Sequence, residues 1–464
     1  MHKIPIARRL GLVAGVLLLS AGAGRAQSAP AAPAGESSSS ATPADAEAST
    51  LGFWQKLGDT TLARLTAEAL RANHDVQVAA ARVRQARAAR TDAALDLAPT
   101  VTVAGGLTRQ RISSATFGLS VPDRSLWDAG LNASWELDLF GRLRGRLRGQ
   151  SALAESARED VRDVQRVLAS ELATAYFDLR GAQDQLEVAR LNAENQRRTL
   201  QLTRDRLDAG RGTEFDTERA RAQLSTTLAT IPLLESRTAA AAHRIGVLVG
   251  REPEALVAEL ANPCALPTLP EEVVSGPVDS LIRARPDVRA AERRLAAETA
   301  FVGAAKADYL PRLSVGGTVG FTSTAFDSLG RSGSGRYAVG PVISWPAFNL
   351  GRVKAQADAA RALEAEARAR HEQTLLLARE DVATARVAYS KARERLTELT
   401  AAADASNRAA ELARLRFEGG VADFLQVLDA ERSLLAAQDQ LAQGRTDTIT
   451  ALVAVYRAIG GGTE

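Results

Sequence analysis

Residues 75–103 read DVQVAAARVRQARAARTDAALDLAPTVTV, and residues 287–315 read DVRAAERRLAAETAFVGAAKADYLPRLSV. The two stretches align without a gap at a constant offset of 212. The identical pairs are Asp75/Asp287, Val76/Val288, Ala79/Ala291, Arg82/Arg294, Ala88/Ala300, Ala93/Ala305, Asp96/Asp308, Pro99/Pro311 and Val103/Val315. This period is far longer than the ~20–50 residues of solenoid repeats. The sequence therefore predicts a duplicated half-molecule, with the same order of helices and strands in each half.

The duplication divides the 464 residues into a leader and two repeats. We expect a signal peptide at 1–26, a disordered tether at 27–50, a first repeat at 51–265 and a second repeat at 266–464. In the first repeat the periodicity predicts strands at about 99–108 and 128–139 and helices at 142–209 and 213–249. In the second repeat it predicts a helix at 278–308, strands at about 312–322 and 337–347, and helices at 350–418 and 421–459.

The first residues have the pattern of an export signal. Lys3, Arg8 and Arg9 precede an apolar run, and the small residues after it offer a cleavage site at Ala26. The Ala, Pro and Ser residues that follow contain too little apolar surface to bury a core. The one cysteine, Cys264, lies far from the cleavage site, so we expect neither an intramolecular disulfide nor a lipid anchor. An uncleaved membrane anchor is the alternative.

Two runs of about 67 residues, 142–208 and 352–418, read as unbroken helix, because the first contains no proline and only three glycines and the second contains neither residue. At ~1.5 Å per residue each run would span about 100 Å. A periodic segment of this length favours coiled-coil packing over a globular bundle. Aromatic residues are 4% of the chain, and its abundant alanines let helices approach closely. The helices alone fit a dimeric rod or tether equally well, which leaves a structural coiled-coil protein of the cell envelope as an alternative.

Four short segments alternate between apolar and polar residues, which is typical of strands with one apolar face and one wet face. In 128–139, for example, Leu131 and Trp135 alternate with polar residues that include Glu136 and Asp138. Each segment has about the ten residues that a tilted strand needs to cross a bilayer. Apolar-out and polar-in alternation is the signature of an outer-membrane barrel. We therefore expect Glu136 and Asp138 to line the barrel lumen.

Four strands cannot close into a barrel, and open strand edges in lipid cost several kcal/mol for each unpaired backbone group. Bacterial barrels begin at about eight strands, and a water-filled lumen needs more. A dimer would supply about eight strands and an interior filled by side chains, whereas a trimer would supply about twelve and an open pore. The sequence thus predicts assembly, and pore formation favours a homotrimer over a dimer.

Several motifs in order resemble a known family. They are WELDLFGR at 135–142, VLVGREP at 247–253, RPDVRAAERR at 285–294 and the segment 417–432. Over about residues 52–460 the chain resembles the outer-membrane factors of tripartite efflux and secretion systems, the TolC-like and OprM/NodT-like channels. The resemblance implies a trimer with a twelve-stranded barrel in the outer membrane of a Gram-negative bacterium and a long helical barrel in the periplasm.

The resemblance also implies partners. These are a periplasmic adaptor (membrane fusion) protein and an inner-membrane pump of the RND or ABC type, while the barrel contacts outer-membrane lipid. Many relatives of the OprM/NodT type carry a lipidated N-terminal cysteine, which this sequence lacks. We therefore expect the barrel alone to hold the protein in the membrane.

In this family the strand hairpins point outward, so the far ends of the long helices mark the periplasmic tip. Glycines interrupt both helical runs there, and glycine fits the left-handed cap that ends a helix. Thr213 is a suitable N-cap for the returning helix, with Asp216 three residues later. We expect these tips to contact the adaptor through Gly210, Gly212, Thr213, Gly419, Gly420 and Asp423.

Leu425, Asp429 and Arg432 lie at i, i+4 and i+7, which is one stripe of a helix. By resemblance, Leu425 and Asp429 match the apolar and acidic rings that constrict the closed pore in this family. We expect Arg432 to pair with an acidic residue of a neighbouring helix, Asp216 or Glu218, and so to hold the periplasmic gate shut. From spacing alone, Asp429 and Arg432 are instead solvated charges on a coiled-coil face.

Composition argues against other classes of protein. Once the signal peptide is removed, 54 basic residues remain against 55 acidic ones, which argues against a nucleic-acid surface. Four histidines, one methionine and one cysteine show no metal-site spacing, and we expect no cofactor. The chain lacks a G-x-S-x-G elbow and a phosphate loop, so we expect no enzyme. We expect a passive exit duct for drugs or other small toxic molecules, with a type I protein or peptide secretion channel of the same architecture as the alternative.

Overall fold

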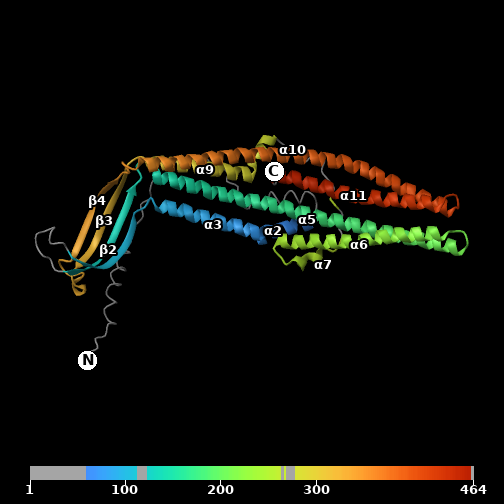
Figure 1. Cartoon of the computed structure of the whole chain (residues 1–464), viewed down its shortest axis with the longest axis horizontal. Helices are drawn as coiled ribbons and strands as arrows, with labels where there is room; N and C mark the ends of the chain where they lie inside the picture. Colours follow the sequence, from blue (N-terminus) through green and yellow to red (C-terminus); the bar gives the residue numbers. More distant parts are fainter. Residues whose placement is uncertain (1–58, 112–122, 263–265, 268–276, 461–464) are drawn as a thin grey trace, which may run out of the picture. The chain divides into compact units, whose positions relative to one another are not determined.

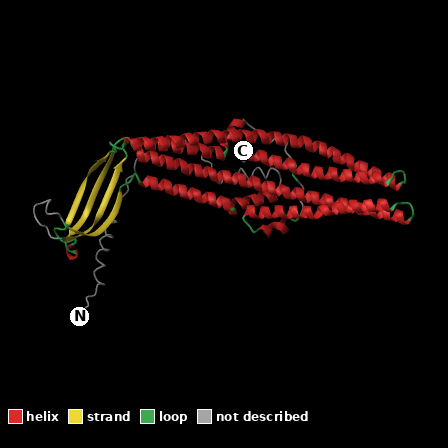
Figure 2. Cartoon of the chain, viewed as in Figure 1, coloured by secondary structure: helices red, strands yellow, loops and turns green. Residues whose placement is uncertain are grey.

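The computed structural model describes residues 59–111, 123–262, 266–267 and 277–460. The predicted signal peptide, the predicted tether and Cys264 lie outside these residues. All described residues belong to one compact unit. Figure 2 shows that the described part consists of long helices and one small sheet. The predicted fold, mostly α with a small β part and two like halves, is confirmed.

Both halves have the same order of elements (Figure 1). The first half contains α2 (Thr60–Ala72), α3 (His74–Leu95), β1 (Thr100–Gln110), β2 (Arg124–Leu137), α5 (Arg142–Asp208) and α6 (Glu214–Val249). A connection with η2 (Pro253–Leu256) and α7 (Val257–Leu260) follows. The second half contains α8 (Val278–Ala284), α9 (Pro286–Ala307), β3 (Arg312–Ser323), η3 (Phe326–Ser328), β4 (Gly335–Ser344), α10 (Leu350–Glu418) and α11 (Phe424–Ala458).

The expectation of one continuous helix at 278–308 is wrong, because the chain breaks there into α8 and α9. Arg285, between the two helices, has φ −59° and ψ 133°, which is an extended conformation. Pro286 causes the break, since a proline ring clashes with a helical conformation of the residue before it. The same proline then begins α9, where the first helical position needs no backbone donor. The first half breaks at Asn73, between α2 and α3, with nearly the same angles, φ −62° and ψ 134°.

The four strands form one antiparallel sheet in the order β1-β2-β3-β4. Two hairpins, β1–β2 and β3–β4, meet along β2 and β3, where Leu131 lies opposite Val319. Within the described residues β1 and β4 each have one partner, so both outer edges carry unpaired backbone groups. Large apolar side chains on this sheet are exposed at Val101, Val103, Leu107, Leu131, Trp135, Val319, Phe321, Tyr337, Val339, Val342 and Ile343.

The seam between the two hairpins depends on a pair of glycines. Gly130 and Gly320 lie opposite each other in the register of β2 and β3. A Cβ atom on Gly130 would lie 2.6 Å from the carbonyl oxygen of Val319, and one on Gly320 would lie 2.6 Å from the Cα atom of Gly130. Because no real Cβ contact is this short, a side chain at either position would force the two strands apart.

Two tryptophans tie the sheet to the helices in the same way in both halves. The indole Nε1 of Trp135 donates to the carbonyl oxygen of Leu97 at 2.9 Å. The indole Nε1 of Trp345 donates to the carbonyl oxygen of Tyr309 at 3.0 Å. Leu97 and Tyr309 follow α3 and α9 at the repeat offset of 212. Each bond fixes the helix-side end of a hairpin against the helix that leads into it.

The long helices form two antiparallel hairpins, α5 with α6 and α10 with α11. The helix α5 also packs against α3, α9 and α11, so it joins the two halves. Small residues permit these contacts: a Cβ atom on Gly149 would overlap the ring of Phe301, and one on Gly181 would overlap Thr446. A buried apolar cluster that includes Tyr176 fills the space where α2, α5, α6 and α11 meet.

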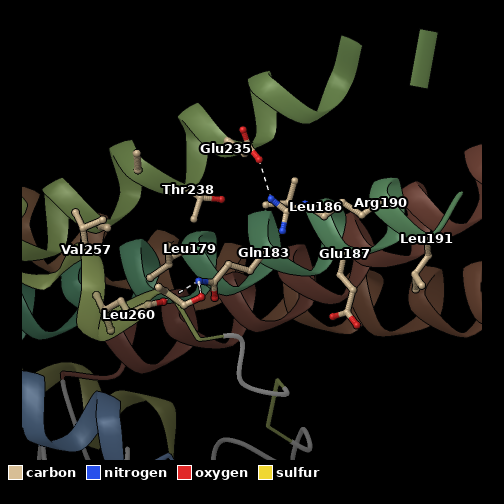
Figure 3. A pocket seen from close by; sticks show the side chains of 13 residues that line it. Leu179, Gln183, Leu186, Glu187, Arg190, Leu191, Glu235, Thr238, Val257 and Leu260 are labelled. Carbon is tan, nitrogen blue, oxygen red and sulfur yellow. Dashed lines mark hydrogen bonds and ion pairs between the residues drawn. The ribbon is translucent and has the colours of Figure 1, made fainter. Parts of the chain in front are cut away.

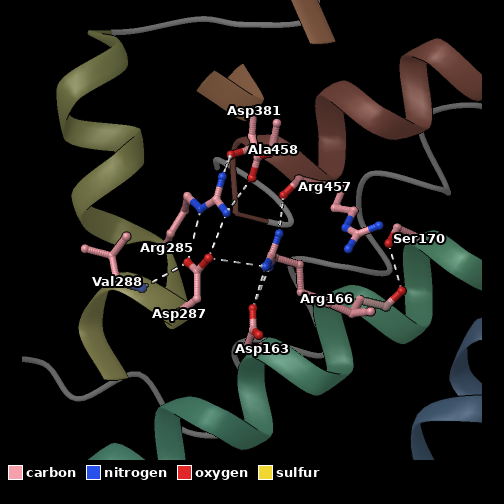
Figure 4. Close-up of polar contacts among 10 residues, drawn as sticks. Asp163, Arg166, Ser170, Arg285, Asp287, Val288, Asp381, Arg457 and Ala458 are labelled. Atoms are coloured by element: carbon pink, nitrogen blue, oxygen red, sulfur yellow. Dashed lines mark hydrogen bonds and ion pairs between the residues drawn. The ribbon is translucent and has the colours of Figure 1, made fainter. Parts of the chain in front are cut away.

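A buried arginine joins three helices at the break between α8 and α9 (Figure 4). Arg285 is 3% exposed, and its Nε and Nη2 atoms donate to Asp287 at 3.1 and 2.7 Å. Its guanidinium also donates to Asp381 of α10 at 3.0 Å and to the carbonyl oxygen of Ala458 at the end of α11 at 2.9 Å. Burial by itself raises the pKa of Asp287, but the hydrogen bonds and charge of Arg285 and the charge of Arg166 outweigh it and hold this pKa below its usual value.

The first half has a neutral counterpart of this arginine. The side-chain Nδ2 of Asn73 donates to the carbonyl oxygen of Leu248 at 2.9 Å, and its Oδ1 accepts from the backbone N–H of Asp75 at 2.8 Å. Leu248 and Ala458 lie 210 residues apart near the ends of α6 and α11. Side chains of different charge thus satisfy an equivalent C-terminal carbonyl in the two halves.

Candidate functional site at the helical tips

The two helical hairpins turn through the same backbone motif, 210 residues apart. Gly210 and Gly420 have φ of +71° and +73°, in the left-handed region that glycine adopts without strain. In both turns the glycine N–H donates to the carbonyl three residues earlier at 2.9 Å, and the next N–H donates to the carbonyl five residues earlier at 2.8 Å. These two bonds define the Schellman motif that closes a helix C-terminus.

Side-chain caps start both returning helices. The hydroxyl oxygen of Thr213 accepts from the backbone N–H of Asp216 at 3.2 Å, and the hydroxyl donates to the Asp216 carboxylate at 2.6 Å. In the second tip the Asp423 carboxylate accepts from the backbone N–H of Gln426 at 3.1 Å. Gly212 lies close to the end of α5, because a Cβ atom there would be 3.0 Å from the backbone nitrogen of Leu207.

Arg206 connects the two tips and was missed by the sequence analysis. Its Nη2 atom donates to the carbonyl oxygen of Phe417 at 2.6 Å, and its guanidinium lies 3.9 Å from the centre of the Phe417 ring. The Phe417 ring packs in turn against Phe424 at 5.7 Å between ring centres. Arg206 therefore caps the C-terminus of α10 from α5, which holds the first hairpin against the second.

Near the tip α11 presents two different faces. One face is buried against the other helices and contains Phe424, Val427, Leu428, Glu431 and Leu434. The other face carries the predicted stripe: Leu425 is 50% exposed, and Asp429 and Arg432 are exposed as well. Among the described residues Asp429 has no hydrogen bond or ion pair.

The predicted partner of Arg432 is wrong within the described chain. Its Nε atom donates to the side-chain oxygen of Gln223 at 2.7 Å. Asp216 binds Thr213, and Glu218 pairs with Arg221 of its own helix at 2.9 Å. The helices α6 and α11 both run away from the tip. Asp216 lies seven residues, or about 10 Å, nearer the tip than Gln223, the residue that Arg432 binds.

Glu431 is a second residue that the sequence analysis missed. Its side chain is 4% exposed and accepts from Thr199 of α5 at 2.8 Å and from Arg414 of α10 at 3.0 Å. A buried carboxylate is stable only when it is paired, so this group holds three helices together next to the exposed stripe. The sequence contains a sign that Glu431 is buried, because this residue falls on the apolar face of α11 midway between Leu428 and Leu434.

Glu136 and Asp138, the two residues predicted to line the lumen, form contacts with the start of α5. The Glu136 carboxylate accepts two bonds from Arg142, at 3.0 and 2.6 Å. Asp138 lies past the end of β2, its side chain is 7% exposed, and it accepts from the backbone N–H groups of Leu143 and Arg144. Both carboxylates therefore tie the end of β2 to the start of α5, where the helix N-terminus favours negative charge.

A groove of about 620 Å³ lies farther along α5, beside α6 and α7 (Figure 3). Its walls are mostly apolar, and most of the polar side chains along it are paired within the chain. The Gln183 amide donates to the carbonyl oxygen of Leu260 at 2.7 Å, and Arg190 donates to Glu235 at 2.7 Å. The groove therefore offers apolar area and no convergent set of titratable groups.

Two features are absent from the described residues. No group of three or more His, Cys, Asp or Glu side chains is placed to hold a metal ion. None of the described helices combines the length and the apolar character that a membrane span requires.

Comparison with known proteins gives one consistent result. The model of the outer membrane efflux protein family matches residues 65–251 and 278–461. The solvent efflux pump outer membrane protein SrpC of Pseudomonas putida is 33% identical over 411 residues, which cover 87% of this chain and 86% of SrpC. The outer membrane protein OprJ of Pseudomonas aeruginosa is 30% identical over 450 residues, which cover 94% of this chain and 91% of OprJ.

Among solved structures, the outer-membrane channel OprN superimposes with a TM-score of 0.85 at 41% sequence identity. The superposition covers 93% of this chain and 99% of the OprN chain. The duplicated hairpins, the open four-stranded sheet and these matches agree, and the chain belongs to the outer membrane efflux protein family, as an outer-membrane efflux channel.

Proposed function

We propose that three copies of this chain close a twelve-stranded barrel, with β1 of one copy beside β4 of the next. The four-stranded sheet carries this proposal. Its outer edges have no partner within the described residues, and it exposes large apolar side chains along its length. Such a sheet aggregates in water. In lipid it is stable once its edges meet those of other copies, because every backbone group is then paired.

The proposed gate of this channel is the exposed stripe of α11. Leu425, Asp429 and Arg432 are uncovered in the single chain and are therefore free to face a three-fold axis. Three Asp429 carboxylates around that axis attract cations and repel one another. A narrow ring of Leu425 side chains excludes water. The bond from Arg432 to Gln223 holds α11 to α6, so opening of the tip requires that this contact break.

The partners in this proposal are a periplasmic adaptor and an inner-membrane pump, which supplies the energy, while the channel itself is passive. In this proposal the adaptor contacts the two tips at Gly210, Gly212, Thr213, Gly419, Gly420 and Asp423. Several relatives are named for small molecules, as solvent, toluene and pyoverdine export components. Their names favour efflux of small apolar or toxic molecules over secretion of proteins.

The proposal includes export by a cleaved signal peptide and attachment by the barrel alone. The relative SilC of Salmonella typhimurium is named as a probable lipoprotein. The one cysteine of this chain, Cys264, lies far from the predicted cleavage site and is not in position for a lipid anchor. The mass of the mature protein purified from membranes tests both points, since a diacyl chain or a retained leader changes it.

Single-channel recording in planar bilayers tests the channel and its gate. The wild-type trimer is expected to conduct weakly, and Asp429→Ala and Arg432→Ser are each expected to raise the conductance severalfold. Asp429→Ala removes the acidic ring, and Arg432→Ser removes the bond to Gln223. Asp404→Ala is the matched control, because Asp404 is an exposed and unpaired aspartate on α10 within the described chain. Equal conductance in all four proteins would overturn the gate, and a wild-type protein without any channel activity would overturn the function.

A further inference from the structure

The first turns of α5 are unusually basic. Residues 141–149 read GRLRGRLRG, which places Arg142, Arg144, Arg146 and Arg148 within nine residues. The first two are neutralised, Arg142 by Glu136 at 2.6 Å and Arg144 by Asp138 at 3.0 Å. Arg146 and Arg148 are exposed, and neither forms an ion pair in the part of the chain that the structure describes.

Two further basic residues are likewise exposed and without an ion pair among the described residues. They are Lys306 in the last turn of α9 and Arg352 in the first turn of α10. The helix ends that carry them lie together. A Cβ atom on Gly145 would lie 3.1 Å from that of Ala304, so the start of α5 packs against the end of α9.

The start of α10 lies beside the same helix end. The Thr299 hydroxyl of α9 donates to Glu364 of α10 at 3.2 Å, and the two helices run antiparallel, so their sheet-side ends adjoin. Arg146, Arg148, Lys306 and Arg352 therefore form a basic collar at the helix-side end of the sheet. Asp92 and Asp96 at the end of α3 are exposed carboxylates that offset part of its charge.

Aromatic side chains adjoin the basic collar on the side of the sheet. The indoles of Trp135 and Trp345 are anchored there by their bonds to carbonyl groups, and both remain about half exposed. Phe140 and Phe348, in the connections from β2 to α5 and from β4 to α10, are exposed as well, and Phe348 is completely so. Exposed aromatic rings next to unpaired cations are the arrangement of a protein surface at the boundary between hydrocarbon and headgroups.

We propose that the basic collar binds the phosphate groups of anionic phospholipids in the membrane leaflet on the helical side. The proposal rests on the proposed function, which places the sheet across the outer membrane. Charge complementarity selects the ligand: four cations that have no ion pair among the described residues face a layer that carries phosphates. Arg148 lies six residues into α5, about 9 Å along the axis, and arginine side chains extend to reach headgroups at this depth.

Lipid binding by the purified trimer tests the proposal. Native mass spectrometry would count lipids retained from detergent micelles that contain either phosphatidylglycerol or phosphatidylcholine. The wild type is expected to retain phosphatidylglycerol in preference. Because each arginine near an anionic surface contributes about a fivefold factor, Arg146→Gln with Arg148→Gln should weaken this binding about 25-fold. Arg204→Gln with Arg408→Gln, which removes two exposed and unpaired arginines of the long helices, should leave it unchanged.

Salt provides a second measurement that needs no variant. The preference of the wild type for phosphatidylglycerol should fall steeply between low and high sodium chloride, since exposed charges are screened. Equal retention of the two lipids by the wild type, or equal losses in the two double variants, would overturn the inference. Channel recording keeps the two proposals separate: a wild type that conducts but shows no lipid preference refutes the collar alone, whereas a wild type that does not conduct refutes the function.

Discussion

Replacement of Arg285 by methionine should weaken the joint between α9, α10 and α11. Methionine has a similar length and no branches, so it fills the space and removes the charge. The change removes two bonds to Asp287, one to Asp381 and one to the carbonyl oxygen of Ala458. Among the described residues, the contacts left to Asp287 are then Arg166, at 3.7 Å, and the backbone N–H of the residue that follows it.

The expected loss is about 3–5 kcal/mol, which is the cost of removing one partner from a buried ion pair. The side chains of Arg285 and Asp287 are 4% and 24% exposed, so water replaces the lost bonds poorly. Arg293→Met on the same helix is the matched control. Its pair with Glu155 is about half exposed on both sides and should be worth less than ~1 kcal/mol.

Unfolding in guanidinium chloride, followed by far-ultraviolet circular dichroism of the detergent-solubilised protein, measures the difference. Addition of Asp287→Asn to Arg285→Met should recover part of the loss, because the isolated buried charge is then absent. Equal unfolding midpoints for Arg285→Met and Arg293→Met would refute the reasoning.

Acidification should reduce the difference between wild type and Arg285→Met. The folded-state pKa of Asp287 lies below its unfolded value of about 3.9, so this group stabilises the wild type at neutral pH, and the contribution is lost as the pH falls through the folded-state pKa. In the variant, protonation instead neutralises a largely buried carboxylate that has lost its main partner. A difference in stability that stays constant between about pH 7 and about pH 3 would contradict the assignment.

Two further predictions concern the sheet. Gly320→Ala should prevent assembly of the proposed trimer, because its Cβ atom would overlap the backbone of β2, whereas Gly316→Ala has open space and should assemble. Gel electrophoresis without heating would measure assembly, and the same result for both variants would refute the role of the glycine pair in the seam. Trp345→Phe should cost about 0.5–1.5 kcal/mol by removing the bond to the Tyr309 carbonyl. The midpoint of thermal dissociation of the trimer checks this value, and an unchanged midpoint would show that the anchor does not contribute.

Most of the secondary structure was readable from local patterns. The turn glycines, Gly210 and Gly420, are required by a backbone conformation that involves a few consecutive residues. The alternation in the strands and the absence of proline from α5 and α10 are equally local signals. The break before Pro286 was missed although its cause is also local, because the helical periodicity on both sides masked the effect of the proline ring on the residue before it.

The sequence by itself thus determined the duplication, the order of helices and strands, and the family, because these follow from short-range conformational rules and ordered motifs. The tertiary structure alone decided the partners of the charged groups. Arg432 binds Gln223, which is 209 residues away, and Arg285 binds the end of α11, which is 173 residues away. Such contacts depend on how far packed helices are shifted along their axes and rotated about them. No local sequence pattern encodes this packing geometry.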